Sequence, residues 1–197
     1  AVTPRTRGIV LNSPGNPTGA VISETELGQL CQAIAGRDIW IILDLCYEQL
    51  IHARTSHNLP SVLDDYAPGQ GVLVGSASKS YAMTGWRIGY ILSENPEAMA
   101  HITKMQYYVT ACSNDAMQYA VLEAMEKASD YPAKMCEEFK ARRDLICERL
   151  NAMPGVSCHI PTGAFYVFPK VDVPGMNSVE VALALLEGGV LCSPGSA

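Results

Sequence analysis

In the first quarter of the chain, segments with strand-like apolar runs alternate with a segment in which apolar residues recur at helical spacing. Strand-like apolar runs occur at 8–13 and 38–44, and the second run is continuous enough to predict a strand buried on both faces. Between them, apolar residues recur every three or four positions over 27–34, as on one face of a helix. Ser23 stands three residues before Glu26, which is the capping-box pattern of a helix start. This order predicts a βαβ unit with parallel strands and a right-handed crossover.

From residue 72 the pattern first continues the sheet and then becomes helical. The elements expected are strands at 72–74 and 86–92, helices at 96–109, 114–128, 131–153 and 178–189, and two short strands within 154–171. Residues 163–168 alternate as a strand would. We therefore predict an α/β fold with a mostly parallel sheet in residues 1–130, followed by a long helix and a second, smaller α+β unit in residues 131–197.

Composition narrows the class of partner. The 197 residues carry a formal net charge of −6 without a basic tract, so nucleic acid is not an expected partner. No apolar run approaches the roughly 18 to 20 residues of a membrane span, so no membrane partner is expected either. The seven cysteines form no C-x-x-C pair, and we interpret them as buried thiols in a reducing cytoplasm. A strand begins almost directly after Ala1, so we expect a piece of a longer protein.

Lys79 poses the main chemical question, because it lies between two predicted strands in a turn of small residues and is expected in a loop. A phosphate-binding P-loop is excluded, since Ser78 and Leu73 stand where its two glycines would be. Ser76 and Lys79 match the S-x-x-K pattern of serine acyl-enzymes, but the S-D-N and K-T-G partners of that pattern are absent.

A third interpretation makes Lys79 a Schiff-base lysine. Such an amine needs neighbouring positive charge and partial removal from water in order to attack a carbonyl. Arg87 would supply the charge while binding a cofactor phosphate, and Ser76 and Ser78 would add hydroxyl donors. Taken alone, Lys79 is equally well explained as a solvated lysine.

Two further stretches bear on that choice. In "NSPGNPTG", Asn16 precedes Pro17 and is therefore extended, while Gly19 can adopt a positive φ, so the Asn16 carboxamide points outward from a strand end. The alternative is an ordinary proline-glycine turn. In "WIILDLCYE", Asp44 ends a buried strand three residues before Tyr47. An acid in so apolar a place usually has a cationic partner; the alternative is a helix cap.

Together, "NSPGNPTG", "DLCY" and "SASKSYAMTGWRIGY" resemble the fold-type I pyridoxal-phosphate enzymes, specifically the class I/II aminotransferases. The resemblance extends through "FKARRDLICERLNAMPGVSCHIPTGAFYVFP" to "GVLCSPGSA", and so covers essentially the whole chain. It implies a three-layer large domain, of which residues 1–130 would be the C-terminal part. The chain departs from the family pattern at Leu45, where an acid is usual, and at Ala77, where an aromatic residue is frequent.

The resemblance also implies roles for individual residues. Lys79 would hold pyridoxal phosphate as a Schiff base and move a proton at the substrate α-carbon, and Asp44 would pair with the pyridine nitrogen. Tyr47 and Asn16 would bind the phenolic oxygen of the ring. The groups expected to hold the phosphate are Ser76, Ser78 and Arg87.

The implied activity is transfer of an amino group between an amino acid and a 2-oxo acid, by a cytoplasmic homodimer. A pyridoxal-phosphate lyase, which breaks a carbon–sulfur bond or closes a small ring, and an inactive remnant are the alternatives. Enzymes of this family are about twice as long. The glycine-containing phosphate loop of their first half and their carboxylate-binding arginine lack counterparts here, so we expect weak or absent activity from residues 1–197 alone.

Overall fold

The computed structural model describes residues 2–52 and 57–196. Its N-terminal part contains the expected βαβ unit, formed by β1 (Gly8–Asn12), α1 (Glu24–Ile34) and β2 (Trp40–Asp44). The two strands are parallel. The predicted capping box is confirmed: the hydroxyl of Ser23 accepts from the Glu26 amide at 3.2 Å, and the Glu26 carboxylate accepts from the Ser23 amide at 2.8 Å.

The sheet continues in chain order as β1-β2-β3-β4. β3 (Gly71–Ser76) is parallel to β2, whereas β4 (Gly89–Leu92) is antiparallel to β3, so the sheet is mostly parallel as predicted. Helix α2 (Leu59–Tyr66), between β2 and β3, was not predicted from the sequence. The signal was present, because Leu59, Val62 and Leu63, its buried side chains, recur at helical spacing.

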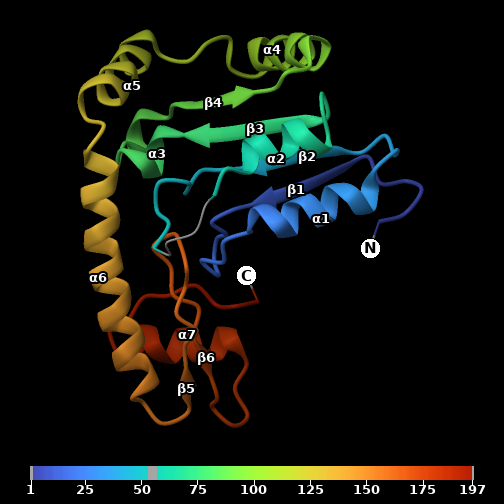
Figure 1. Ribbon diagram of the computed structural model, residues 1–197. Coiled ribbons are helices and arrows are strands. Elements are labelled where there is room, and N and C mark those ends of the chain that lie inside the picture. Colours follow the sequence, from blue (N-terminus) through green and yellow to red (C-terminus); the bar gives the residue numbers. More distant parts are fainter. Residues whose placement is uncertain (1, 53–56, 197) are drawn as a thin grey trace.

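The hydrophobic core lies between the sheet and two helices, α1 and α2, which cover one face of it (Figure 1). Leu27 of α1, Leu59 of α2, and Ile41 and Leu43 of β2 are all fully buried. Residues of β2 alternate between buried and half-buried, with Ile42 only half-buried. The prediction that this strand is buried on both faces therefore holds for one face only in the described chain.

The remaining helices and short strands follow beyond β4. They are α4 (Pro96–Thr110), α5 (Asp115–Lys127), α6 (Tyr131–Asn151), β5 (Val156–Ser157), β6 (Lys170–Val171) and α7 (Ser178–Glu187). Figure 1 shows α6 running from the carboxyl ends of the parallel strands down to the small antiparallel β5–β6 sheet and α7. Among the described residues, no helix combines the length and hydropathy needed to cross a bilayer.

Two expectations need correction. Residues 163–168 are not a strand; only Gly163 forms an isolated bridge, to Ile51, because this segment crosses to the sheet domain instead of pairing along its length. The cysteines are free thiols, but Cys112 and Cys192 are exposed rather than buried.

Candidate active site

The three sequence motifs meet at one edge of the sheet because the parallel strands carry them at their carboxyl ends. Asn12, the last residue of β1, lies opposite Asp44, the last residue of β2. Asp44 in turn lies opposite Val74 of β3, two residues before Ser76. Loops at this edge are where α/β proteins place ligands.

A turn after β1 carries Asn16. The side-chain amide of Asn12 donates to the carbonyl oxygen of Asp44 at 3.1 Å, and its Oδ1 accepts from the Asn16 backbone amide at 2.7 Å. Asn12 therefore joins the turn to the end of β2, a role that sequence analysis missed. Gly19 has φ of 66°, as predicted. The residue Asn16 is exposed, which agrees with an outward-pointing carboxamide.

Asp44 is half-buried at the end of β2. Its Oδ1 accepts from the backbone amide of Cys46 at 3.0 Å, so it caps the turn over 46–49 rather than a helix. Within the part of the chain that the structure describes, no Lys, Arg or His forms an ion pair with Asp44. The cationic partner expected for this acid is thus not supplied by those residues.

Tyr47 follows on the same turn and is only 5% exposed. Its hydroxyl lies 2.5 Å from the hydroxyl of Tyr166. Burial, and secondarily the contact with Tyr166, raises the pKa of Tyr47 well above its ordinary value of 10. The ring of Phe165 packs edge-on against Tyr47, with 5.5 Å between the ring centroids.

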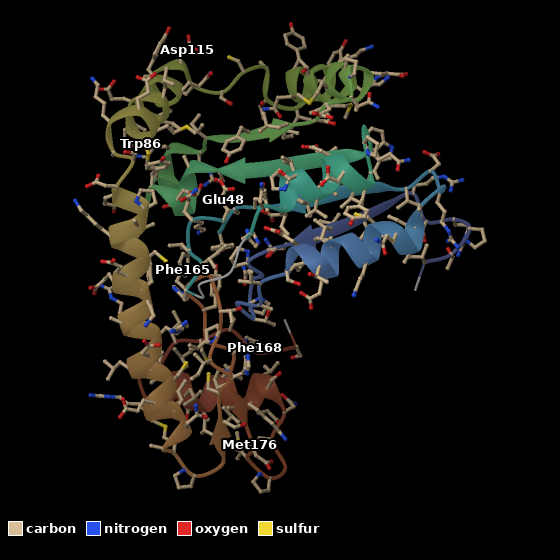
Figure 2. The ribbon with its side chains drawn as sticks, in the orientation of Figure 1. Glu48, Trp86, Asp115, Phe165, Phe168 and Met176 are labelled. Atoms are coloured by element: carbon tan, nitrogen blue, oxygen red, sulfur yellow. The ribbon has the colours of Figure 1, made fainter. Side chains whose placement is uncertain are left out.

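Lys79 lies in α3 (Ala77–Ser80), a single helical turn directly after β3, and not in a loop as expected. Its Nζ is 5.4 Å from the centroid of the Phe165 ring. One aromatic ring therefore contacts both the lysine motif and Tyr47 of the aspartate motif. Figure 2 shows Phe165 at the junction between the sheet and the C-terminal part. Its alternation with Tyr166 in the sequence gave no sign of this placement.

The predicted phosphate-binding residues lie at the same edge. Ser76 caps α3, where its Oγ accepts from the Ser78 amide at 3.1 Å. Arg87 comes directly after the 3-10 turn η1 (Thr84–Trp86), and its Nη1 donates to the Thr84 carbonyl at 2.6 Å. Since Gly89 pairs with Ser76 across β3 and β4, Arg87 is held near the start of α3. It is exposed and forms no ion pair with any described residue.

Cys46, within the aspartate motif, lies close to the lysine motif. Burial and the nearby Asp44 carboxylate raise the pKa of the Cys46 thiol, whereas a hydrogen bond with Ser76 and the charge of Lys79 lower it. Residues of the aspartate motif and of the lysine motif therefore both lie near this thiol. The described residues contain no cluster of His, Cys, Asp or Glu suited to a metal.

A crossing segment from the C-terminal part contacts this edge of the sheet domain. We call residues 161–166 the strap. The Gly163 amide donates to the Gly19 carbonyl, and the Ala164 amide to the Leu50 carbonyl, each at 2.8 Å. The His52 amide donates to the Thr162 carbonyl, also at 2.8 Å. The strap is thus fixed to both the Asn16 turn and the segment after Tyr47.

The whole chain, residues 1–197, matches the family described as aminotransferase class I and II. The chain belongs to this family. The chain departs from the family pattern at Leu45 and Ala77, whose side chains are 6% and 4% exposed. Both are packed in the interior, which is compatible with apolar side chains.

Individual aminotransferases support the assignment to this family. The chain is 38% identical to a probable N-acetyl-LL-diaminopimelate aminotransferase of Bacillus subtilis, covering 100% of the chain and 49% of that protein. It is 38% identical to a probable aspartate/prephenate aminotransferase of Aquifex aeolicus, covering 100% of the chain and 51% of that protein. The chain therefore spans about half the length of these relatives.

Solved aminotransferase structures agree. A Thermus thermophilus aspartate aminotransferase variant superposes with a TM-score of 0.90 at 34% identity, covering 99% of the chain and 53% of that structure. An aromatic aminotransferase from Pyrococcus horikoshii gives the same TM-score and identity, covering 99% of the chain and 52% of that structure. These likenesses establish the α/β architecture of fold type I.

Proposed function

We propose that this chain carries the pyridoxal-phosphate site of an aminotransferase that transfers an amino group between an amino acid and a 2-oxo acid. The observation that supports this best is the position of Phe165, whose ring is 5.5 Å from the ring of Tyr47 and 5.4 Å from Nζ of Lys79. One ring thus contacts both an amine and a phenol, which follow the neighbouring strands β3 and β2. The relatives named above are aminotransferases, which does not favour a lyase.

The residues at the sheet edge fit the proposed cofactor. Pyridoxal phosphate has an aldehyde, a basic ring nitrogen and a phosphate, and so needs an amine, a carboxylate and cationic or hydroxyl donors. Lys79 provides the amine, and Asp44 provides a carboxylate that forms no ion pair with any described residue. Arg87 provides a cation that forms no ion pair with any Asp or Glu that the structure describes. Ser76 and Ser78 flank the start of α3.

Each residue then has a distinct task. The bound cofactor supplies an electron sink for the substrate carbon that loses a proton. Lys79 Nζ holds the cofactor and moves the α-proton of the substrate. Asp44 keeps the ring nitrogen protonated, because a carboxylate favours the charged form of a neighbouring base. Tyr47 and Asn16 bind the ring oxygen, and Arg87 with the two serines binds the phosphate.

The organisation of the whole enzyme is also a proposal. We assign residues 1–130 to the large domain and residues 131–197 to the connecting helix and part of the small domain. The family resemblance supports a homodimer acting on small molecules. Apolar side chains on α4, such as Met105 and Tyr108, are exposed here, which is compatible with their burial against other parts of the whole enzyme. The free state of all seven cysteines supports a reducing cytoplasm.

Reductive labelling tests the proposed function. The protein is incubated with pyridoxal phosphate and reduced with borohydride, and its peptides are analysed by mass spectrometry. The experiment uses residues 1–197 alone and a chimera in which they replace the matching half of the Bacillus subtilis relative. We expect label at Lys79, and none in Lys79→Ala, whereas Lys104→Ala on the exposed face of α4 is labelled as before. Label at another lysine would contradict the proposal.

Transamination is then assayed in the same chimera. The amino acid and 2-oxo acid are varied, and the products are identified chemically. Formation of a new amino acid and a new 2-oxo acid supports an aminotransferase. An eliminated thiol or a cyclised amine would instead identify a lyase.

A further inference from the structure

The hydroxyls of Tyr47 and Tyr166 share one hydrogen bond, in which one hydroxyl donates and the other accepts. Their hydroxyl oxygens are 2.5 Å apart, and each hydroxyl has one proton to donate. Only one of the two protons can lie between the oxygens. The other hydroxyl is then free to donate elsewhere.

Tyr166 is brought to Tyr47 by a backbone that is fixed at several points. Ala164, two residues before Tyr166, has φ of 57° and is 1% exposed. A non-glycine residue adopts this conformation at an energetic cost, and persists in it where its surroundings enforce it. Here the Ala164 amide donates to the Leu50 carbonyl at 2.8 Å, and the Ala164 carbonyl accepts from Nε2 of His52 at 2.7 Å.

The surrounding rings further restrict Tyr166. Its centroid is 5.6 Å from that of Tyr47 and 4.8 Å from that of Phe165. Phe139 of α6 also contacts Phe165, with 5.1 Å between the ring centroids. Contacts with neighbouring rings therefore hold Tyr166, which is half-buried, with its hydroxyl against that of Tyr47.

We propose that Tyr166 is a positioning residue that donates its hydrogen bond to Tyr47 and so directs the proton of Tyr47 toward the cofactor ring oxygen. This inference rests on the proposed function. In the cofactor-free protein Tyr47 can donate to Tyr166. When Tyr47 donates to the ring oxygen instead, the contact between the two hydroxyls persists only if Tyr166 becomes the donor. A donor that itself accepts a hydrogen bond donates more strongly.

The visible absorbance of the lysine-bound cofactor, titrated against pH in the chimera, tests this inference. Donation to the ring oxygen stabilises its anionic form and lowers the pKa of this absorbance change. In Tyr166→Phe the weakened bond from Tyr47 should raise that pKa by on the order of a few tenths of a pH unit. Tyr47→Phe should raise it further. Tyr131→Phe, at an exposed position on α6, should leave it unchanged.

The double variant separates positioning from a general structural effect. If Tyr166 acts only through Tyr47, adding Tyr166→Phe to Tyr47→Phe produces no additional shift. Unchanged absorbance titration in Tyr166→Phe alone, or equal shifts in both backgrounds, would overturn the inference while leaving the proposed function intact. Absence of the absorbance from the unsubstituted chimera and from every variant would instead contradict the proposed function, and with it this inference.

A second readout needs no cofactor. The urea midpoints of unfolding are compared for the unsubstituted protein, Tyr47→Phe, Tyr166→Phe and the double variant. Because both substitutions remove the same hydrogen bond, we expect their effects to be non-additive. Additive effects would show that the two hydroxyls are not energetically coupled, against the inference.

Discussion

Gly163 donates its backbone amide to the carbonyl of Gly19 at 2.8 Å, and this contact leaves no room for a side chain on either residue. A Cβ on Gly19 would lie 2.5 Å from Cβ of Pro161, and a Cβ on Gly163 would lie 2.6 Å from Cγ of Pro14. The strap and the Asn16 turn therefore pack backbone against backbone. Close packing here sets the position of Phe165 and Tyr166.

Gly163→Ala should destabilise the protein by about 1–3 kcal/mol, the usual cost of overpacking a close contact. Besides Pro14, the new methyl group would meet Cγ2 of Val21 at 2.9 Å. Urea unfolding of the chimera measures the effect. Gly85→Ala is the matched control, because a Cβ at Gly85 has no neighbour within 4 Å. Equal stability of the two variants would show that the strap can move away from the turn.

Local sequence rules predicted the sheet domain well because its elements are specified locally. Ser23 and Glu26 determine where α1 begins, and the apolar runs around Ile41 and Val72 determine two parallel strands. The strand predicted at 163–168 was wrong for a physical reason. Phe165 and Tyr166 both contact Tyr47, far away in the sequence, and of this segment only Gly163 pairs with another segment, in an isolated bridge to Ile51.

The candidate site was predictable only where a motif stands at the end of a strand. Asn16, Asp44 and Lys79 remain predictions as site residues, and the strand ends bring the segments that carry them to one edge of the sheet. Asn12 was missed, and Tyr166 was interpreted as part of a strand, since a strand-end asparagine and a tyrosine in an apolar run have no distinctive local pattern. Their roles arise from tertiary packing.

Asp44→Asn should lower transamination by about 10²–10³-fold, the usual cost of removing one preorganised electrostatic group. Asparagine keeps the size of the side chain and an oxygen that can accept from the Cys46 amide, which Asp44 binds at 3.0 Å. The fold should therefore persist, and borohydride labelling of Lys79 should continue. Steady-state kinetics of the chimera provide the measurement.

Asp65→Asn is the control for this substitution, because Asp65 is an exposed residue of α2. It should leave the rate unchanged. If Asp44→Asn retained full activity, the carboxylate would not be needed, and its assignment to the ring nitrogen would be wrong.

Arg87→Ala should weaken cofactor binding by about 10- to 100-fold, which corresponds to loss of one hydrogen bond to a charged group. Absorbance titration with pyridoxal phosphate measures the dissociation constant. Arg142→Ala is a suitable control, since Arg142 is exposed on α6 and pairs with Glu138 at 2.9 Å. Unchanged affinity in Arg87→Ala would remove this residue from the phosphate site.

His52 joins the strap to the segment after Tyr47, and its surroundings favour the neutral ring. Its Nε2 donates to the Ala164 carbonyl at 2.7 Å, and its Nδ1 lies 3.6 Å from Sγ of Cys136. Burial lowers the pKa of His52 from its ordinary value of 6.5, although the bond to Ala164 opposes this. Of the charged neighbours, Arg143 and Lys140 also lower the pKa, whereas Asp144 raises it.

Stability should consequently fall as the pH is lowered below 6.5. The unfolded chain takes up a proton at His52 near pH 6.5, whereas the folded chain does so only at a lower pH, so the unfolded state binds more protons in between. The contribution of neutral His52 to the free energy of unfolding is complete above pH 6.5 and is lost as the pH falls toward the pKa of His52 in the folded chain. His57, whose pKa burial also lowers, acts in the same direction. Urea midpoints of unfolding between about pH 7 and pH 5 measure the slope of stability against pH.

His52→Gln keeps an amide donor for Ala164 but cannot titrate, so it should reduce that slope, whereas His101→Gln at an exposed position of α4 should not. A slope unaffected by His52→Gln would show that His52 does not couple protonation to folding.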